Sequence, residues 1–278
     1  MIDTNTTIDN LTITNNLLFS KFMKDEEICR TVLNDLLPFE VGTVKNVNYE
    51  KTIFAGLTSR GVRLDVYAQD DENKVYNIEM QVTNNKNLPL RVRYYQSCID
   101  LELINKGEDY IELKDSIIIV ICTFDPFGAG LPCYTFKNVC EEDNGTIFKD
   151  GRTILFFNAE AFFKEQSEKR RDFLAFICGK EIHSEQYDTF NKRIQSIKNN
   201  EEFRREYMLW TAEVADARRE SEAKGIAIGE VRGEARGIAI GKLETARNLL
   251  GLLDDTVIAK TTGLPLSDIL SLKKEAVN

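Results

Sequence analysis

Apolar and polar residues alternate in two neighbouring runs, 62–68 and 75–82, and this pattern predicts a β-hairpin. The apolar members of each run share one face of their strand: Val62, Leu64, Val66 and Ala68 in the first, and Tyr76, Ile78, Met80 and Val82 in the second. Asp65 and Glu79 fall on the other, less apolar faces. If the turn is centred on Glu72, Asp65 lies directly opposite Glu79, with roughly 5 Å between Cβ atoms.

Two carboxylates at that separation repel each other and destabilise the sheet unless a cation lies between them. Mg²⁺ resolves this conflict, because it binds a few carboxylate oxygens and keeps several water ligands for chemistry. The alternative is a solvated sheet face on which the acids pair with Arg63 or with lysines. Spacing alone leaves both interpretations open.

Four further segments have clear patterns. Residues 16–37 repeat apolar positions at three- and four-residue steps and predict one helix that Pro38 ends. Residues 44–54 predict a strand leading into the hairpin, and residues 56–61 a loop. The almost uninterrupted apolar run 116–123 predicts a strand that is covered on both faces. A strand covered in this way implies a central sheet with helices on both sides.

A helix is predicted directly after the hairpin, capped by Asn85 or Asn87. Four residues on one side of this helix are expected to pack on the sheet: Leu90, Tyr94, Cys98 and Leu101. Arg91 and Tyr95 line a neighbouring stripe, and Gln96 is expected to face elsewhere. Arg91 could hold a phosphate and Tyr95 could stack near a site, or the two could form a simple packing pair.

Further along the chain the pattern predicts strands at 134–140 and 146–158, with 149–152 as the tight turn of a hairpin. A helix is expected over 159–182, and the core is expected to close near residue 185.

Composition narrows the class of protein. The chain has 36 basic and 45 acidic residues, a net charge of −9, which counts against a nonspecific nucleic-acid binder unless a local basic patch recruits DNA. Its 42% hydrophobic and 29% charged residues are typical of a soluble globular protein, and no apolar run is long enough to span a bilayer. Six cysteines without a CxxC pair indicate reduced thiols in the cytoplasm, and a single histidine argues against a zinc site.

Five blocks occur along the chain in a fixed order: RLDVYA, YNIEMQ, RVRYYQS, YTFKNVC and ILFFN. This order resembles the Rpn family of recombination-promoting nucleases, a group also described as transposases, within the PD-(D/E)XK nuclease superfamily. The resemblance is strongest over residues 17–158. It implies an α/β, restriction-endonuclease-like fold, with a mixed central sheet flanked by helices, and a DNA substrate.

The resemblance also implies roles for individual residues. Asp65 and Glu79 occupy the positions of the family's metal ligands, with the Met80 carbonyl as a third ligand, and the ion is Mg²⁺ or alternatively Mn²⁺. Gln81 stands where the superfamily usually has lysine, so a neutral amide replaces a cation. Three nearby cations could compensate: Lys86, Arg91 and Arg93. Arg91 and Tyr95 are expected to contact substrate.

The superfamily often takes one more acid from its first helix. The resemblance therefore offers Asp25, Glu26 or Glu27 for this role. The alternative, which we favour, is that these acids form a solvated helix face.

The tail has a different composition, with glycine at every fourth position from 225 to 241. Each glycine costs a helix about 1 kcal/mol relative to alanine, so this helix requires a close partner. A short heptad-like seam of four apolar residues predicts self-association: Ile228, Val231, Ala235 and Ile238. A flexible, partly helical linker is the alternative.

The last segment predicts two short helices around Thr262-Gly263-Leu264 and resembles a helix-turn-helix. Its expected core is Val257, Ile258, Leu264 and Ile269. The second helix offers no arginine, which weakens a role in reading the major groove.

The sequence therefore predicts four regions: a flexible N-terminus at 1–16, a nuclease-like domain at 17–185, a helical glycine-periodic segment at 186–248 and a helix-turn-helix-like element at 249–278. The expected activity is that of a metal-dependent DNA endonuclease, linked to recombination or mobile elements. The alternative is a catalytically degenerate nuclease fold that acts as a binding or regulatory module.

Overall fold

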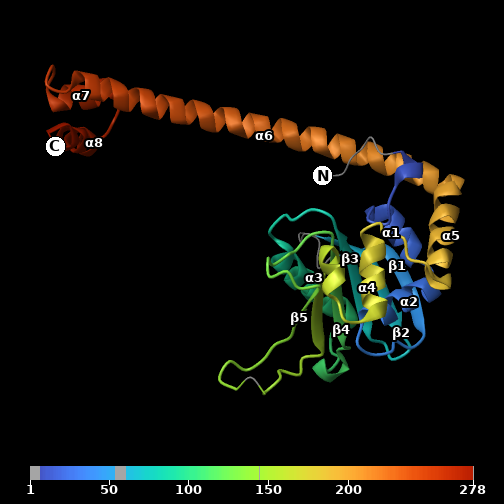
Figure 1. Cartoon of the computed structure of the whole chain (residues 1–278). Helices are drawn as coiled ribbons and strands as arrows, with labels where there is room; N and C mark the ends of the chain where they lie inside the picture. The colour runs from blue at the N-terminus through green and yellow to red at the C-terminus, as the bar shows by residue number, and fades with distance from the viewer. Residues whose placement is uncertain (1–6, 54–60, 144, 278) are drawn as a thin grey trace. The chain divides into compact units, whose positions relative to one another are not determined.

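The computed structural model describes residues 7–53, 61–143 and 145–277 (Figure 1). The chain divides into two compact units, Met1–Met208 and Leu209–Asn278. The predicted loop at 56–61 lies outside the described residues except for Gly61.

A mixed sheet of six strands forms the centre of the first unit. The strands are β1 (Val44–Ile53), β2 (Val62–Asp70), β3 (Val75–Gln81), β4 (Ser116–Cys122), β5 (Cys133–Phe136) and β6 (Arg152–Asn158). Their order across the sheet is β1-β2-β3-β4-β6-β5. The pairs β1–β2, β2–β3 and β5–β6 are antiparallel, whereas β3–β4 and β4–β6 are parallel. The predicted mixed central sheet is confirmed.

Helices cover both faces of this sheet. They are α1 (Asn16–Met23), α2 (Glu26–Leu36), α3 (Leu88–Leu103), α4 (Glu168–Ile177) and α5 (Glu185–Asn199), with short 3-10 helices η1 (Ile8–Asn10), η2 (Tyr110–Glu112) and η3 (Ala159–Lys164). Residues of α3 pack in one cluster with Val120 and Phe156, while Arg170 of α4 lies 5.7 Å from the ring centroid of Phe157 on the opposite face. All of β4 is buried, as its apolar run predicts.

The hairpin register follows the prediction. Val66 pairs with Ile78, Tyr67 with Asn77, Ala68 with Tyr76 and Gln69 with Val75. Every pair sums to 144, so the turn is centred on Glu72. Beyond this ladder both acids lie near α3, since the charge of Arg91 on that helix opposes the rise in the pKa of Asp65 and of Glu79.

The predicted helix at 16–37 is two helices. The side chain of Asp25 accepts a hydrogen bond from the Ile28 backbone N–H at 3.2 Å and caps the start of α2. A cap requires non-helical backbone, so the chain turns between Met23 and Glu26. The same contact gives Asp25 a structural role, and Glu27 lies 3.8 Å from Arg30.

The predictions after β4 need three corrections. β5 ends at Phe136 and β6 begins only at Arg152, so 149–152 is the approach to β6 rather than a tight hairpin turn. Asp150 shapes this approach by accepting the Arg152 backbone N–H at 3.2 Å. The predicted helix at 159–182 is η3 followed by α4, because Ser167 caps a new helix.

The buried face of α3 also differs from the prediction. Leu90 is 60% exposed, Tyr94 37% and Leu101 61%, and of the expected face only Cys98 is buried. The sheet instead receives Leu88, Val92, Gln96, Cys98 and Ile99. Gln96 can be buried because its side-chain amide donates to Ser116 and Asp100, each at 2.7 Å.

Both ends of the first unit extend beyond the predicted core. Within the N-terminal segment expected to be flexible, Leu11 and Ile13 are buried, and Lys198 donates to the Asp9 carbonyl at 3.0 Å. Phe190 of α5 packs edge-on against Phe22 of α1, with ring centroids 5.1 Å apart. The first compact unit therefore continues past the expected boundary near 185, to Met208.

The second unit contains most of α6 (Glu201–Leu249), followed by α7 (Asp255–Thr262) and α8 (Leu266–Val277). Its small core consists of Ala246, Ile258, Ile269 and Leu272, with Leu264 packed against it. Gly263 ends α7 in the left-handed conformation, at φ +69°. Val257, expected in this core, is exposed. Among the described residues, no helix has both the length and the apolar character needed to cross a bilayer.

Candidate active site

The two acids of the hairpin meet where the β2–β3 ladder stops. The last paired residues are Val66 and Ile78. Beyond them the Asp65 backbone N–H donates to Glu79 Oε1 at 3.3 Å, and the Met80 backbone N–H donates to Asp65 Oδ2 at 3.0 Å. Each carboxylate thus takes the place of a carbonyl on the neighbouring strand. This exchange holds both acids at one point near α3.

Burial and mutual repulsion favour the neutral forms of both acids. Glu79 is 2% exposed, and its pKa is raised well above the usual value by burial and then by the nearby charge of Asp65. Burial raises the pKa of Asp65 to about 6, although the Met80 N–H and Arg91 oppose the shift. A buried acid beside a half-buried one, with so little compensation, forms a site that a cation would stabilise.

Arg91, in the first turn of α3, supplies the positive charge beside the acids. Its Nη1 donates to Gln81 Oε1 at 3.0 Å and its Nη2 donates to the Tyr95 hydroxyl at 2.8 Å. Nη2 also lies 3.9 Å from Glu79 Oε2. The predicted group of Arg91, Tyr95 and Gln81 is therefore assembled around Glu79, and Arg91 connects its members.

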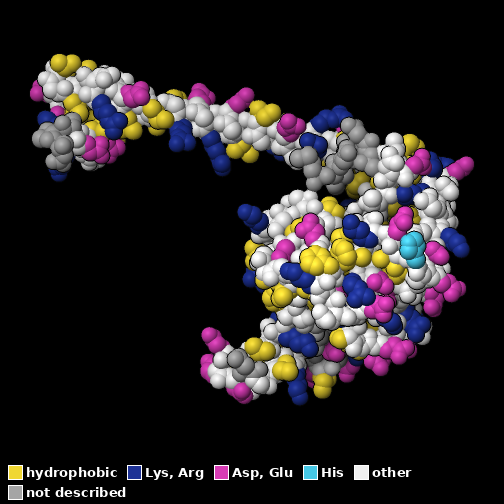
Figure 2. Space-filling view, in the orientation of Figure 1, with side chains coloured by type: hydrophobic (Ala, Val, Ile, Leu, Met, Phe, Trp, Pro, Cys, Tyr) yellow, Lys and Arg dark blue, Asp and Glu magenta, His cyan; other side chains and the backbone are white. Residues whose placement is uncertain are grey.

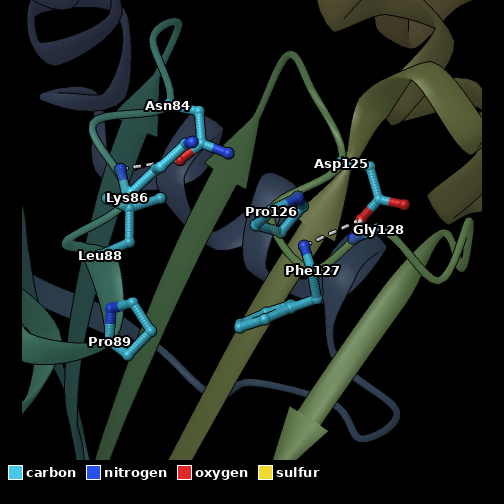
Figure 3. A pocket seen from close by; sticks show the side chains of 8 residues that line it. All are labelled: Asn84, Lys86, Leu88, Pro89, Asp125, Pro126, Phe127 and Gly128. Atoms are coloured by element: carbon cyan, nitrogen blue, oxygen red, sulfur yellow. Dashed lines mark hydrogen bonds between the residues drawn. The ribbon is translucent and has the colours of Figure 1, made fainter. Parts of the chain in front are cut away.

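Gln81 and the three candidate cations lie in different surroundings. The Gln81 backbone carbonyl accepts the Thr123 N–H at 3.0 Å. The Gln81 side chain is directed to the site, where its Oε1 accepts a hydrogen bond from Arg91. Lys86 instead lines a separate pocket of about 430 Å³, between the loops after β3 and β4 (Figure 3). Arg93 is exposed on α3. Of the three cations considered, Arg91 is the one with contacts to Glu79 and Gln81.

The residues present suit a divalent cation of the Mg²⁺ type. No group of three or more His, Cys, Asp or Glu side chains suited to a metal occurs in the described part of the chain, so the protein would supply two carboxylates. Mg²⁺ is usually held by one or two carboxylates, with water and substrate phosphate completing its shell. Asn77, fully buried two residues before Glu79 on the same strand, adds a polar side chain beside this acid and opposes the rise in its pKa.

An open pocket of about 580 Å³ adjoins the acids on the α3 side. It is lined by Gly61, Val62, Arg63, Asn87, Leu90, Arg91, Tyr94 and Tyr95. The sequence pattern placed Leu90 and Tyr94 in the core, and so missed them as lining residues. Their one signal was position: they flank Arg91 and Tyr95 on the same helix.

Charged side chains of both signs are interspersed over the face shown in Figure 2. The protein has a net charge of −9, so a general positive charge does not mark this site. Its basic groups, Arg63 and Arg91, are notable for their position near the acids. His183, the single histidine, is exposed and has no place in the site described above.

Comparison with known proteins gives one match. A family profile described as PD-(D/E)XK nuclease family transposase matches residues 16–222. A search of curated proteins and a search of solved structures gave no match. The matched region contains the whole sheet and every residue of the site, and the resemblance drawn from the five sequence blocks is confirmed at the level of the superfamily. The chain belongs to the PD-(D/E)XK nuclease family transposases.

Proposed function

We propose that this protein is a Mg²⁺-dependent DNA endonuclease of the Rpn type, which hydrolyses phosphodiester bonds and acts in recombination or on mobile elements. One observation carries the proposal. Asp65 and Glu79 are locked together by reciprocal hydrogen bonds to backbone N–H groups, with Glu79 almost fully buried and both pKa values raised. Acids whose pKa values are strongly perturbed by burial and by a specific charged neighbour are typical of active sites.

Asp65 and Glu79 would hold the ion, with the Met80 carbonyl as the third protein ligand and Mn²⁺ as an alternative metal. Such an ion lowers the pKa of water and neutralises charge that develops on the phosphate. The Met80 N–H keeps Asp65 in place, and the Asp65 N–H keeps Glu79 in place. The protein therefore contributes a pair of ligands whose positions are set before the ion arrives.

Arg91 would take over the electrostatic role of the superfamily's lysine. Its guanidinium is charged at all physiological pH values and offers several donors in a fixed plane. Gln81 and Tyr95 each accept one of these donors, which orients the group beside Glu79. Gln81 would keep its amide N–H groups for water or a phosphate oxygen.

The direct test is cleavage of supercoiled plasmid in Mg²⁺, Mn²⁺ or Ca²⁺. We expect Asp65→Ala and Glu79→Ala to lower the rate at least about 1,000-fold, because the metal supplies several kcal/mol of transition-state stabilisation. Glu72→Ala, an exposed acid in the turn of the same hairpin, is the matched control and should cleave normally. Full cleavage by either purified site variant would refute the assignment.

A degenerate nuclease fold that binds or regulates is the second candidate. Gln81 in place of lysine and the net charge of −9 favour it. Calorimetric titration with Mg²⁺ and Mn²⁺ separates the two candidates. An active nuclease shows binding that Glu79→Ala removes, whereas absence of binding together with absence of cleavage would favour the degenerate module.

Self-association through α6 is part of the proposal. Ile228, Val231 and Ile238 are exposed on this helix. At about 100° per residue they lie on the side opposite the glycines, whose missing Cβ atoms would meet nothing within 4 Å. The apolar seam, rather than the glycine stripe, would therefore contact a second copy. Light scattering should give more than one chain for the full protein and one chain for Val231→Asp. A monomeric parent protein would contradict this.

A cytoplasmic location fits this function. All six cysteines are free, and Cys29, Cys98 and Cys122 are buried. Thiols kept reduced and a DNA substrate are both typical of that compartment.

A further inference from the structure

The outer side of α3 presents apolar side chains to solvent next to the catalytic acids. Leu90 and Tyr94 are 60% and 37% exposed, and both line the pocket of about 580 Å³. Side chains of this kind are usually found in a core. Here they form one wall of a cavity.

Arg91 joins this pocket to the site. It is a lining residue of the pocket, and the same guanidinium donates to Gln81 and lies 3.9 Å from Glu79. A group seated in the pocket therefore contacts the same guanidinium that lies beside Glu79.

The lining combines two chemistries. Arg63 and Arg91 offer positive charge, and Arg63 lies 3.7 Å from Glu50, in an ion pair whose arginine is 57% exposed. Such exposed pairs contribute little energy, so Arg63 can exchange Glu50 for a phosphate. Tyr94, Tyr95 and Leu90 offer rings and an apolar surface. Arginine for the backbone and aromatic rings for the bases is the pattern of sites that bind single strands.

Resting on the proposed nuclease function, we propose that this pocket receives an unpaired nucleobase adjacent to the scissile phosphate, stacked on Tyr94, so that the enzyme prefers single-stranded or locally unpaired DNA. A base inside a duplex cannot reach a pocket of this kind without leaving its stack, which costs free energy. An unpaired base enters without that cost. Arg63 contacts the phosphate of the same nucleotide.

The test measures binding without cleavage. Fluorescence anisotropy in EDTA compares one labelled oligonucleotide as a single strand and as a blunt duplex of the same sequence, using the full chain. The wild type should bind the single strand at least about tenfold more tightly. Equal affinity for the two substrates would overturn the proposal, even if the protein cleaves duplex DNA when Mg²⁺ is added.

Two substitutions separate stacking from packing. Tyr94→Leu keeps an apolar side chain but removes the ring, and should weaken single-strand binding about tenfold while leaving duplex binding unchanged. Tyr94→Phe keeps the ring and should bind as the wild type does. Leu101→Ala, at a more exposed position on α3 outside the pocket, is the control and should change neither affinity. Unchanged binding by Tyr94→Leu, or an equal loss for both substrates, would overturn the proposal.

These outcomes are independent of the catalytic assignment. Cleavage that survives Asp65→Ala would refute the proposed function and leave the strand preference measured in EDTA intact. Loss of the strand preference with cleavage still dependent on Asp65 would refute only this inference.

Discussion

The two ends of the β2–β3 hairpin bury acids in opposite ways. At the turn, Asp70 accepts hydrogen bonds from the Glu72 N–H at 3.0 Å, the Lys74 N–H at 2.9 Å and the Tyr76 hydroxyl at 2.8 Å. Three donors compensate one carboxylate. This acid is a structural element that fixes the turn, since each buried acceptor has a partner.

At the open end, two acids receive fewer hydrogen bonds. Asp65 and Glu79 each accept one backbone N–H, and Arg91 stands 3.9 Å from Glu79. Both pKa values are raised as a result. The same two strands thus hold, at the turn, one acid with three hydrogen-bond donors and, at the open end, two acids with one backbone donor each. The number of donors, rather than the residue type or depth, separates the structural acid from the candidate catalytic ones.

After the two acids themselves, the largest effect within this comparison is expected at Arg91. Arg91→Ala removes the charge beside Glu79 and should lower Mg²⁺-dependent cleavage about 100-fold, because one preorganised electrostatic group contributes this much in comparable sites. Arg93→Ala, an exposed arginine on the same helix, should leave the rate unchanged. Equal rates for the two variants would mean that the open end does not depend on Arg91.

The pH dependence of stability should differ between the two ends. Folding raises the pKa of Asp65 from 3.8 to about 6 and that of Glu79 well above 4.5, so the folded state binds more protons. Metal-free stability should therefore fall as pH rises from about 4 through about 6 and above. Urea unfolding in EDTA at pH 5 and pH 8 measures this fall.

Glu79→Gln should flatten this dependence, because it removes the repulsion between the acids. Mg²⁺ at 100 times its Kd should restore about 2.7 kcal/mol to the wild type at pH 8. Asp35, whose pKa burial raises to about 6, titrates in the same range, so the difference between wild type and Glu79→Gln is the informative quantity. An identical pH slope for the two proteins would contradict the account.

Asp70→Ala should affect stability and leave chemistry alone. It removes three hydrogen bonds and leaves the buried Tyr76 hydroxyl without its partner, so we expect a loss of about 3 kcal/mol in urea unfolding. Cleavage per folded molecule should remain normal. A variant that unfolds normally but no longer cleaves would reverse the roles given to the two ends.

The smallest effect is expected for Tyr76→Phe, which removes one of the three bonds to Asp70. A loss of about 1 kcal/mol is expected. Combined with Asp70→Ala, the effects should be clearly less than additive, because both changes break the same contact. Simple additivity would show that the hydroxyl and the carboxylate act independently.

Helix α3 shows where sequence patterns mislead. The spacing assigned Leu90, Tyr94, Cys98 and Leu101 to the sheet, whereas the buried side of the helix contains Leu88, Val92 and Ile99. Gln96 made the true inner face look polar, but its amide nitrogen donates to Ser116 and Asp100 there. Leu90 and Tyr94 were consequently assigned to the core, although they line the pocket.

The break between α1 and α2 shows a second limit. The apolar repeat continues across it, and Asp25 could as well have been a solvated acid in a continuous helix. Capping needs the right backbone angles, and these depend on how both helices pack on the sheet.

The sequence by itself determined the hairpin and its register from Val66 and Ile78 to the turn, because strand alternation and a symmetric turn are local properties. It also determined the covered strand β4, whose continuous apolar run allows little else. Only the tertiary structure decided which cation contacts Gln81, which side of α3 is exposed and how deeply Glu79 is buried. These depend on segments distant in sequence meeting across the sheet, and burial and charge act through space rather than along the chain.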